Sequence, residues 1–251
     1  TRVGTSTWVY DTPAHPSAVK TAGTNSYTYD ANGNMETRNG ADLDYDYENR
    51  LIRITKGGAT NTYVYDYTGA RIKKTTQTST TFYIGNLYEV KDGVATKHIF
   101  AGGRRIASKT GSSIYYFHPD HLGGLNVVTD NDGRNVQSNT YYPFGETRDT
   151  IGSDILQYKF TGQENDPESG LYYYGARFYD PVIGRFITPD SIVQKVQAEV
   201  ARIVKTPDVI EALRPLGLEL AATSSDEFAA LIRKEMPAYA KTFKDIGIEK
   251  E

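Results

Sequence analysis

A tyrosine-rich pattern recurs early in this 251-residue chain and limits what the chain can fold into. The segments YTYD, YDYE and YVYD begin at Tyr27, Tyr45 and Tyr63, with a spacing of 18 residues in both steps. Because side chains alternate between the two faces of a strand, both rings of each Tyr-x-Tyr pair are predicted to share one face. The turn dipeptides Asn32-Gly33 and Thr68-Gly69 follow, and then a return strand with apolar and basic positions. Each copy is therefore predicted to be one β-hairpin.

Similar turn signals continue as far as residue 186. Lys91-Asp92-Gly93, Lys109-Thr110-Gly111 and Asn131-Asp132-Gly133 each lie between β-prone runs. In the segment GLYYYGARFYDPVIGRFITPD, the pattern predicts a strand over 172–179, a turn over 180–184 and a return strand over 185–188. We predict a mainly β fold, a ribbon of antiparallel β-hairpins whose tyrosines form cross-strand aromatic pairs. An alternative interpretation of the tyrosines is a platform of rings that stacks against sugars.

The composition of the chain changes near residue 190. Of its 20 tyrosines and 23 glycines, only Tyr239, Gly217 and Gly247 lie beyond that point. Capping signals occur at Thr206-Pro207 and at Ser224, and apolar residues recur at helical spacing. The tail is therefore predicted to be a short α-helical appendage, with one apolar stripe formed by Ile192, Val193, Val196, Val200, Ile203 and Val204.

Charge and composition exclude several classes of protein. A net charge of −3 gives no general attraction to nucleic acid or to an anionic membrane surface. The absence of cysteine excludes disulfides and thiolate chemistry. No apolar run approaches the roughly 18–20 residues that span a bilayer, so no membrane span is predicted. No signal peptide is recognisable at Thr1, and the chain is interpreted as a fragment or a processed piece.

The run His118-Pro119-Asp120-His121 contains residue types that bind metal ions. The other two histidines, His15 and His98, have no spacing that suggests a further ligand. We therefore predict no metal site, and we expect Asp120 to cap the turn before LGGL.

Two pairs of carboxylates are candidates for acid–base chemistry: Glu164 with Asp166, and Asp180 with Asp190. Each lies in a turn context in which a solvated or arginine-paired carboxylate is commoner, so no catalytic residue and no cofactor is predicted. The basic residues Arg104, Arg105, Arg177 and Arg185 are expected to pair with acidic strand positions or to cover tyrosine rings.

Several motifs of the chain resemble a known family. The YxYD copies resemble the YD repeats of the Rhs (rearrangement hotspot) proteins, which are also found in the C components of Tc insecticidal toxins and in teneurins. Four further motifs resemble the Rhs-associated core in its usual order: HPDHLGGLNVVTD (118–130), YYPFGE (141–146), FTGQENDPESGLYYYGARFYD (160–180) and PVIGRFITPD (181–190). The resemblance covers about residues 1–190.

This resemblance implies a shell. In the family the hairpins form a ribbon that spirals into a hollow β-cage, the core plugs one end, and the cage holds a variable C-terminal toxin. The resemblance implies a structural role in that core for His118, Asp120, His121, Gly123, Pro143, Phe144, Gly145, Gly162, Glu164, Gly170, Leu171, Tyr172, Tyr173, Arg177, Tyr179, Asp180, Pro181, Gly184, Arg185 and Phe186.

The chain departs from the family pattern after Asp190. Such cores continue with Asp-Pro and end at a second Asp-Pro-x-Gly-Leu, where self-cleavage often releases the toxin, whereas this chain continues with Ser191-Ile192. Self-cleavage is therefore not expected, and no catalytic aspartate is assigned. A segment with about eight to ten hairpins is also too short to enclose a domain by itself.

Residues 191–251 resemble a different family, the C-terminal end of the Bug/TctC solute-binding receptors of tripartite tricarboxylate transporters. The patterns P-x-V, L-x-x-L-G, S-x-x-E-F and K-x-x-G-I occur there in the same order. The two lobes that form the ligand pocket of such receptors are not part of this resemblance, so a solute-binding function is not carried over.

Three parts are thus predicted: YD-repeat hairpins over 1–110, an Rhs-associated core over 111–190 and a helical tail over 191–251. The predicted function is that of a structural and interaction segment of an Rhs-type toxin shell, secreted or at a bacterial surface, without enzymatic activity. Its expected partners are the rest of the shell and an encapsulated effector. The alternatives are an adhesion module that binds a cell surface or glycan, and a fusion or truncation product without independent activity.

Overall fold

The described part of the chain is almost entirely β, as predicted. The computed structural model describes residues 8–10, 17–190, 202–203, 206 and 209. Its strands are β1 (Trp8–Tyr10), β2 (Val19–Ala22), β3 (Asn25–Tyr29), β4 (Met35–Arg38), β5 (Ala41–Tyr45), β6 (Leu51–Lys56), β7 (Ala59–Tyr65), β8 (Arg71–Thr75), β9 (Thr80–Ile84), β10 (Tyr88–Lys91), β11 (Val94–Ala101), β12 (Arg104–Thr110), β13 (Ser113–Pro119), β14 (Leu125–Thr129), β15 (Asn135–Tyr141), β16 (Thr147–Gly152), β17 (Glu164–Asp166), β18 (Leu171–Tyr173), β19 (Phe178–Asp180) and β20 (Arg185–Phe186). A short 3-10 turn, η1 (Phe160–Gly162), precedes β17. The predicted helical tail lies outside the described residues, apart from the last few positions given above.

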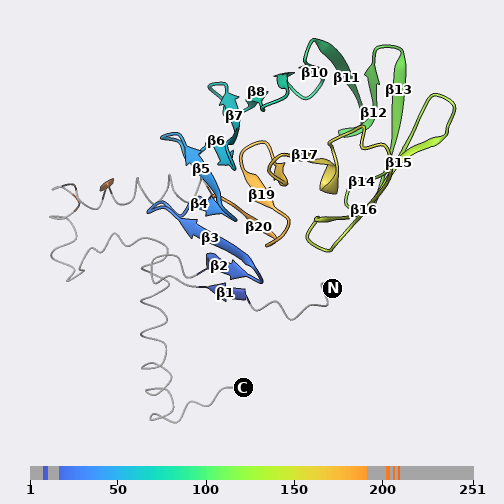
Figure 1. Ribbon diagram of the computed structural model, residues 1–251. Coiled ribbons are helices and arrows are strands. Elements are labelled where there is room, and N and C mark those ends of the chain that lie inside the picture. Colours follow the sequence, from blue (N-terminus) through green and yellow to red (C-terminus); the bar gives the residue numbers. More distant parts are fainter. Residues whose placement is uncertain (1–7, 11–16, 191–201, 204–205, 207–208, 210–251) are drawn as a thin grey trace, which may run out of the picture.

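The strands follow one another in space in the order of the sequence. Strands β1 to β16 form one sixteen-stranded antiparallel sheet, and β17 to β20 form a second sheet of four strands. Figure 1 shows the large sheet bending into an arc, with the gold and orange strands of the small sheet on its concave side. The ribbon is therefore continuous, because each strand from β1 to β15 pairs with the strand that follows it.

The small sheet belongs to a part of the chain that we call the inner segment, residues 157–190, and this segment supplies much of the core. The larger apolar cluster combines residues of β2 to β7, such as Tyr27 and Leu43, with Leu171, Phe178 and Ile187 of the inner segment. A smaller cluster contains Phe117, Leu125, Val128 and Leu156. The inner face of the ribbon is thus buried by a segment that comes after it in the sequence.

Five of the connections between strands share one loop, in which an aspartate holds the backbone. Oδ1 of Asp30 accepts hydrogen bonds from the backbone N–H groups of Asn32 at 2.9 Å and Asn34 at 2.8 Å. The fourth loop residue, Gly33, has a φ of 83°, which glycine adopts without strain. The same carboxylate bonds recur in loops 46–50, 66–70, 120–124 and 130–134. The aspartate of each YD motif is therefore a turn residue, and the tyrosine before it belongs to the strand.

The predicted repeat spacing of 18 residues is wrong for the middle copy. The loop aspartates Asp30, Asp46 and Asp66 are 16 and 20 residues apart. Tyr47 consequently falls inside a loop with 91% of its surface exposed, and it does not share a face with Tyr45. The other two Tyr-x-Tyr pairs pack on one apolar cluster, as predicted.

A β-bulge follows the loop in each of these hairpins and changes which side chains point inward. In β6, Leu51 pairs with Tyr45 and Arg53 pairs with Asp44, so the residue between them is extra. Inward positions then lie three residues apart, and Leu51 and Ile54 are both buried. The same shift occurs next to the loops that precede β4, β8, β14, β15 and β16.

In the loops that begin at Asp30, Asp46 and Asp66, the tyrosine directly before the aspartate connects its hairpin to the preceding one. The hydroxyl of Tyr45 donates to the carbonyl of Met35 at 2.8 Å, and the hydroxyl of Tyr65 donates to the carbonyl of Leu51 at 2.6 Å. Tyr29 makes the equivalent bond to Val19 at 3.0 Å. These bonds join consecutive repeats through the buried face of the ribbon.

The prediction of one strand over 172–179 is wrong. That stretch forms β18 and β19, which pair antiparallel, with Tyr172 opposite Tyr179. Between them the backbone N–H of Tyr174 donates to the carbonyl of Arg177 at 2.8 Å, which closes a turn around Gly175. The predicted turn lies at 181–184, and the predicted return strand is present but shorter, as β20 covers only Arg185–Phe186 and pairs with β19.

Among the described residues, no helix is long and apolar enough to cross a membrane.

The tyrosine bond between repeats can be tested with Tyr45→Phe. This change leaves the ring in place but removes the donor to the Met35 carbonyl, so we expect the free energy of unfolding in urea to fall by about 1 kcal/mol. Tyr47→Phe is the matched control, because the Tyr47 ring is exposed in the loop, and it should have no measurable effect. Equal losses in the two variants would contradict the assignment.

Candidate functional site

The bulge places two cations on the inner face of β8. The positions occupied by Leu51 and Ile54 in β6 are occupied by Arg71 and Lys74 in β8, and both of these side chains are buried. Their partners come from β17, about 90 residues later in the sequence, where Glu164 and Asp166 lie on one face of the strand. We call these four residues the buried charge cluster.

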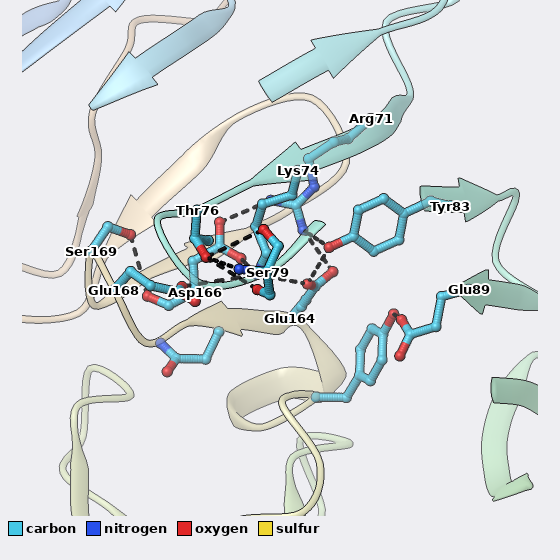
Figure 2. Close-up of polar contacts among 12 residues, drawn as sticks. Arg71, Lys74, Thr76, Ser79, Tyr83, Glu89, Glu164, Asp166, Glu168 and Ser169 are labelled. Carbon is cyan, nitrogen blue, oxygen red and sulfur yellow. Dashed lines mark hydrogen bonds and ion pairs between the residues drawn. The ribbon is translucent and has the colours of Figure 1, made fainter. Parts of the chain in front are cut away.

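The buried charge cluster is compact and formally neutral. Asp166, which is fully buried, receives Lys74 Nζ on Oδ1 at 2.7 Å and Arg71 Nη1 on Oδ2 at 2.8 Å. Arg71 Nη2 lies 2.6 Å from Oε2 of Glu164. Figure 2 shows the two cations reaching from β8 toward the carboxylates of β17.

Aromatic rings surround these charges. The hydroxyl of Tyr83 donates to Oε1 of Glu164 at 2.7 Å, and its ring lies 4.8 Å from the guanidinium of Arg71. The ring of Tyr173 covers the same guanidinium at 4.3 Å, and its hydroxyl accepts the backbone N–H of Arg71 at 2.9 Å. Glu168 approaches Lys74 from the rim at 3.9 Å. Water is thus kept from the ion pairs by rings that also bond to them.

Electrostatics keeps Asp166 ionised. Burial alone would raise the pKa of Asp166, but the guanidinium of Arg71 and the ammonium of Lys74 outweigh burial and hold it below the usual range. The two carboxylates raise the pKa of Lys74 against the opposing effect of its burial. A general acid must hold a proton near neutral pH, and this carboxylate does not. The cluster therefore has the properties of a structural contact between the ribbon and the inner segment.

A second buried ion pair fixes the other end of the inner segment. Arg38 of β4 forms a two-pronged contact with Asp180, at 2.6 Å from Nε and 3.0 Å from Nη2, and donates to the carbonyl of Ser169 at 2.8 Å. Asp190 contacts Arg177 instead, at 3.2 Å. The two carboxylates of the candidate pair Asp180 and Asp190 therefore contact different arginines.

The core motifs lock into one another around the YYPFGE turn. The hydroxyl of Tyr172 donates to the carbonyl of Gly145 at 3.0 Å, and that of Tyr179 donates to the carbonyl of Phe144 at 3.0 Å. A methyl group on Gly145 would lie 2.3 Å from the ring of Phe160, and one on Gly184 would lie 3.0 Å from the ring of Phe144. Residues from three of the four core motifs therefore pack around this one turn.

The histidine-containing motif lies in a loop of the kind described above. Oδ1 of Asp120 accepts the backbone N–H groups of Leu122 and Gly124 at 2.9 and 2.7 Å, which is the geometry of a turn cap. His118 contacts Oγ1 of Thr129 at 3.1 Å, whereas His121 borders a cavity beside the loop. In the part of the chain that the structure describes, no three His, Cys, Asp or Glu side chains are grouped so that they could hold a metal ion.

The remaining residues of the core motifs occupy turns and ring contacts. Gly123, Gly162 and Gly170 have φ values of 81°, 73° and 71°. Leu171 is fully buried in the larger apolar cluster, and the ring of Phe186 makes edge contacts with the rings of Tyr174 and Tyr179. Arg177 lies over Phe186, Arg185 over Tyr10 and Arg105 over Tyr158, so three of the four arginines expected to pair or to cover rings do contact rings. Pro143 and Pro181 each lie in a turn, directly before Phe144 and directly after Asp180.

Sequence reasoning missed Arg38, Arg71 and Lys74, three ribbon cations that form ion pairs with the inner segment. Strict alternation along β8 does not place Arg71 and Lys74 on one face, because they are three residues apart. The available signal was the loop: the fifth and eighth residues after Asp66 are Arg71 and Lys74, as Leu51 and Ile54 are after Asp46.

A model of the Teneurin YD-shell family matches residues 7–212, which is most of the chain. The chain belongs to the Teneurin YD-shell family. The match agrees with the YD resemblance, with the antiparallel ribbon and with the interlocked core motifs, and it extends past residue 190, where the tail was predicted to begin.

Curated relatives of this YD-shell chain include large toxins. The tRNA nuclease WapA of Bacillus subtilis (strain 168) is 33% identical over 180 residues, which cover 66% of this chain and 8% of WapA. The double-stranded DNA deaminase toxin A of Burkholderia cenocepacia (strain H111) is 34% identical over 91 residues, covering 34% of this chain and 6% of the toxin. Salivary gland surface protein 1 of Aedes aegypti is 41% identical over 78 residues, 30% of this chain and 2% of that protein. The chain thus spans 8% or less of the length of these relatives.

Solved structures with the same fold come from Tc toxin complexes. The crystal structure of TcdB2–TccC3 superposes with a TM-score of 0.57 at 23% identity, covering 64% of this chain and 10% of that chain. The TcdB2–TccC3–Cdc42 structure gives a TM-score of 0.56 at 20% identity, covering 74% of this chain and 12% of that one. These similarities establish the fold of the YD-shell segment.

The buried charge cluster can be tested with Asp166→Asn. This change leaves Arg71 and Lys74 with Glu164 as their remaining buried anion, so we expect the free energy of unfolding to fall by about 3 kcal/mol. The control is Asp44→Asn, which breaks an exposed 2.7 Å pair with Arg53 and should have little effect because solvent screens it. Urea denaturation measures both variants, and a loss in Asp166→Asn no larger than in the control would contradict the role of the cluster.

The contribution of Asp166 should depend on pH. A carboxylate whose pKa is lower in the folded than in the unfolded chain stabilises the fold above the unfolded pKa of about 3.9, and this stabilisation is lost as the pH falls through the folded pKa. The difference in unfolding free energy between the wild type and Asp166→Asn should be constant between about pH 5 and 8 and should shrink below about pH 4. Chemical denaturation at several pH values tests this, and a difference that widens in acid would refute it.

The packing around the YYPFGE turn can be tested with Gly145→Ala. Gly133 occupies the same loop position with a similar positive φ, but a methyl group there would meet nothing within 4 Å. Gly133→Ala should therefore cost only the backbone term of about 1 kcal/mol. Gly145→Ala should cost roughly 1–3 kcal/mol more, because the ring of Phe160 must move. Thermal unfolding compares the two variants. Equal decreases in the unfolding temperature would show that the contact with Phe160 does not contribute to stability.

Proposed function

We propose that the chain is a structural part of a toxin shell. In this shell the inner segment packs on the concave face of the ribbon and helps to enclose a C-terminal effector. The observation that carries this proposal is the pair of buried ionic contacts, Arg71 and Lys74 with Asp166 and Arg38 with Asp180. They fix the inner segment to strands about 90 to 140 residues earlier in the sequence. A closure held by buried charges is insulated from the solvent that weakens exposed ion pairs.

The proposal gives the chain a structural role and no catalytic one. The buried charge cluster is neutral and enclosed, and its carboxylate Asp166 is ionised, so it offers neither a proton donor nor an open ligand position. The nuclease and deaminase activities in the names of the relatives belong to proteins of which the chain spans 8% or less. Its partners would be further YD-repeat hairpins of the same shell and the effector inside it, secreted or at a bacterial surface.

Protection from protease, measured on the full-length protein, tests whether the shell encloses the residues that follow the inner segment. Residues after Asp190 include the trypsin sites Lys195, Arg202 and Lys205. If the shell encloses the residues beyond the inner segment, these sites should be cleaved slowly in the wild type and faster in Asp166→Asn, whose closure is weakened. Asp44→Asn serves as the control and should behave as the wild type. Rapid cleavage at these sites in the native wild type, with residues 17–190 intact, would contradict enclosure.

A second candidate function, glycan-binding adhesion, is favoured by two exposed rings. Tyr47 and Tyr67 occupy the second position of consecutive loops and are 91% and 98% exposed. Arg50 of the first loop donates to the carbonyl of Asp66 in the second at 3.3 Å, which ties the two loops together. Screening of residues 1–190 and of Tyr47→Ala/Tyr67→Ala on a glycan array tests this function. Failure to bind any sugar, or binding that survives the double substitution, would remove it.

A further inference from the structure

A cavity of about 580 Å³ lies between the inner segment and the part of the ribbon that runs from β8 to β14. Its wall is mixed: the rings of Tyr83, Phe100, Phe117 and Tyr158 line it together with charged residues, among them Arg105 of β12. This volume falls in the range of about 300–1,000 Å³ that is typical of sites for small ligands. The cavity borders the buried charge cluster, but none of the ion pairs described above uses Arg105.

Arg105 is partly buried, and it differs from the other buried or partly buried cations of the described residues. Arg38, Arg71, Lys74 and Lys159 each contact a carboxylate at 2.9 Å or less. No ion pair to Arg105 occurs among the residues that the structure describes, and its Nε is buried without a hydrogen-bond partner. Its guanidinium instead lies against the ring of Tyr158, 3.2 Å from the centroid, and 5.2 Å from that of Phe100.

The nearby carboxylates are already engaged. Glu164 contacts Arg71, Lys74 and Tyr83. Oε2 of Glu89 accepts the hydroxyl of Tyr158 at 3.2 Å and lies 3.5 Å from Nε2 of His98. Burial consequently lowers the pKa of Arg105, whereas the pKa values of Arg38 and Arg71 are raised by their carboxylates. A partly buried guanidinium without a carboxylate partner loses solvation that no ion pair replaces, and a bound anion would offset that cost.

We propose that Arg105 and this cavity bind a carboxylate that is attached to an aromatic or other apolar group. The planar guanidinium offers parallel N–H donors that match the two oxygens of a carboxylate. The guanidinium lies against the ring of Tyr158, and the rings of Tyr83, Phe100 and Phe117 provide apolar surface for the rest of the ligand. A free aromatic acid and the C-terminal carboxylate of a peptide ending in phenylalanine share this chemistry.

The test uses the full chain labelled with ¹⁵N and titrated with sodium phenylacetate, with phenylacetamide as the neutral probe of nearly the same shape. The Nε–Hε signal of Arg105, identified by its absence in Arg105→Lys, should shift and saturate with phenylacetate and stay unchanged with phenylacetamide. Equilibrium dialysis should show that Arg105→Gln weakens phenylacetate binding by roughly 10- to 100-fold, as expected for the loss of a charge-assisted hydrogen bond. Arg134→Gln is the control, because the side chain of Arg134 is 74% exposed and does not line the cavity.

Each outcome decides the proposal. Equal binding of the two probes, no binding of either carboxylate, or unchanged phenylacetate binding in Arg105→Gln would overturn it. If Arg105→Gln does not fold, the comparison of the two probes on the wild type decides alone. An acetylated glycine-rich hexapeptide with a C-terminal phenylalanine, tested as free acid and as amide, separates the two sources. Binding of the peptide acid with no binding of phenylacetate would assign the site to a chain end, and binding of phenylacetate would assign it to a free acid as well.

Discussion

The ribbon depends on one constraint: its inner face must be covered, and residues 157–190 cover it. Leu171, Phe178 and Ile187 of this inner segment complete the apolar cluster that the tyrosines of the ribbon begin. The contact includes backbone groups, since the N–H of Met35 donates to the carbonyl of Ile187 at 2.8 Å and that of Leu125 to the carbonyl of Lys159 at 2.9 Å. Both donors are the first residues after a loop, where the bulge interrupts the ladder. The ribbon therefore presents N–H groups outside its own ladder at these two positions, and the inner segment satisfies them.

The same loop and bulge recur in each repeat. An aspartate accepts two backbone N–H groups within the loop, a residue with positive φ closes it, and the bulge that comes next shifts the inward side chains. Bulges also increase the local twist of a strand pair, which fits the arc of the sheet in Figure 1. The tyrosine before the aspartate then bonds to the preceding repeat. Curvature, inward chemistry and connection between repeats thus result from the same short motif.

The sequence predicted the class of the fold because turn dipeptides are local signals. Asp92 and Gly93, for example, have the positive φ values that a two-residue hairpin loop requires. The buried charge cluster was not predicted, since it joins β8 to a strand some 90 residues away and since the bulge hides which residues of β8 face inward. The spacing of 18 residues gave a wrong register for a similar reason. The loop begins at the fourth residue of YTYD and YVYD but at the second residue of YDYE, so similar letters occupy different positions in the hairpin. Local chemistry is visible in the sequence, whereas register across a bulge is not.

The charges on β8 also bear on how the inner segment finds its place. Apolar residues at these positions, as in β6, would bury surface without specifying which strand lies opposite. With Arg71 and Lys74 there, a slip of β17 by one residue would turn Glu164 and Asp166 to the other face and leave two buried cations without partners. Such a state is costly, because an unpaired buried charge loses its solvation and gains nothing. Desolvation of the four charges lowers the net stability that the contact provides. The same charges favour one register of β17 over its neighbours, because only that register pairs all four of them.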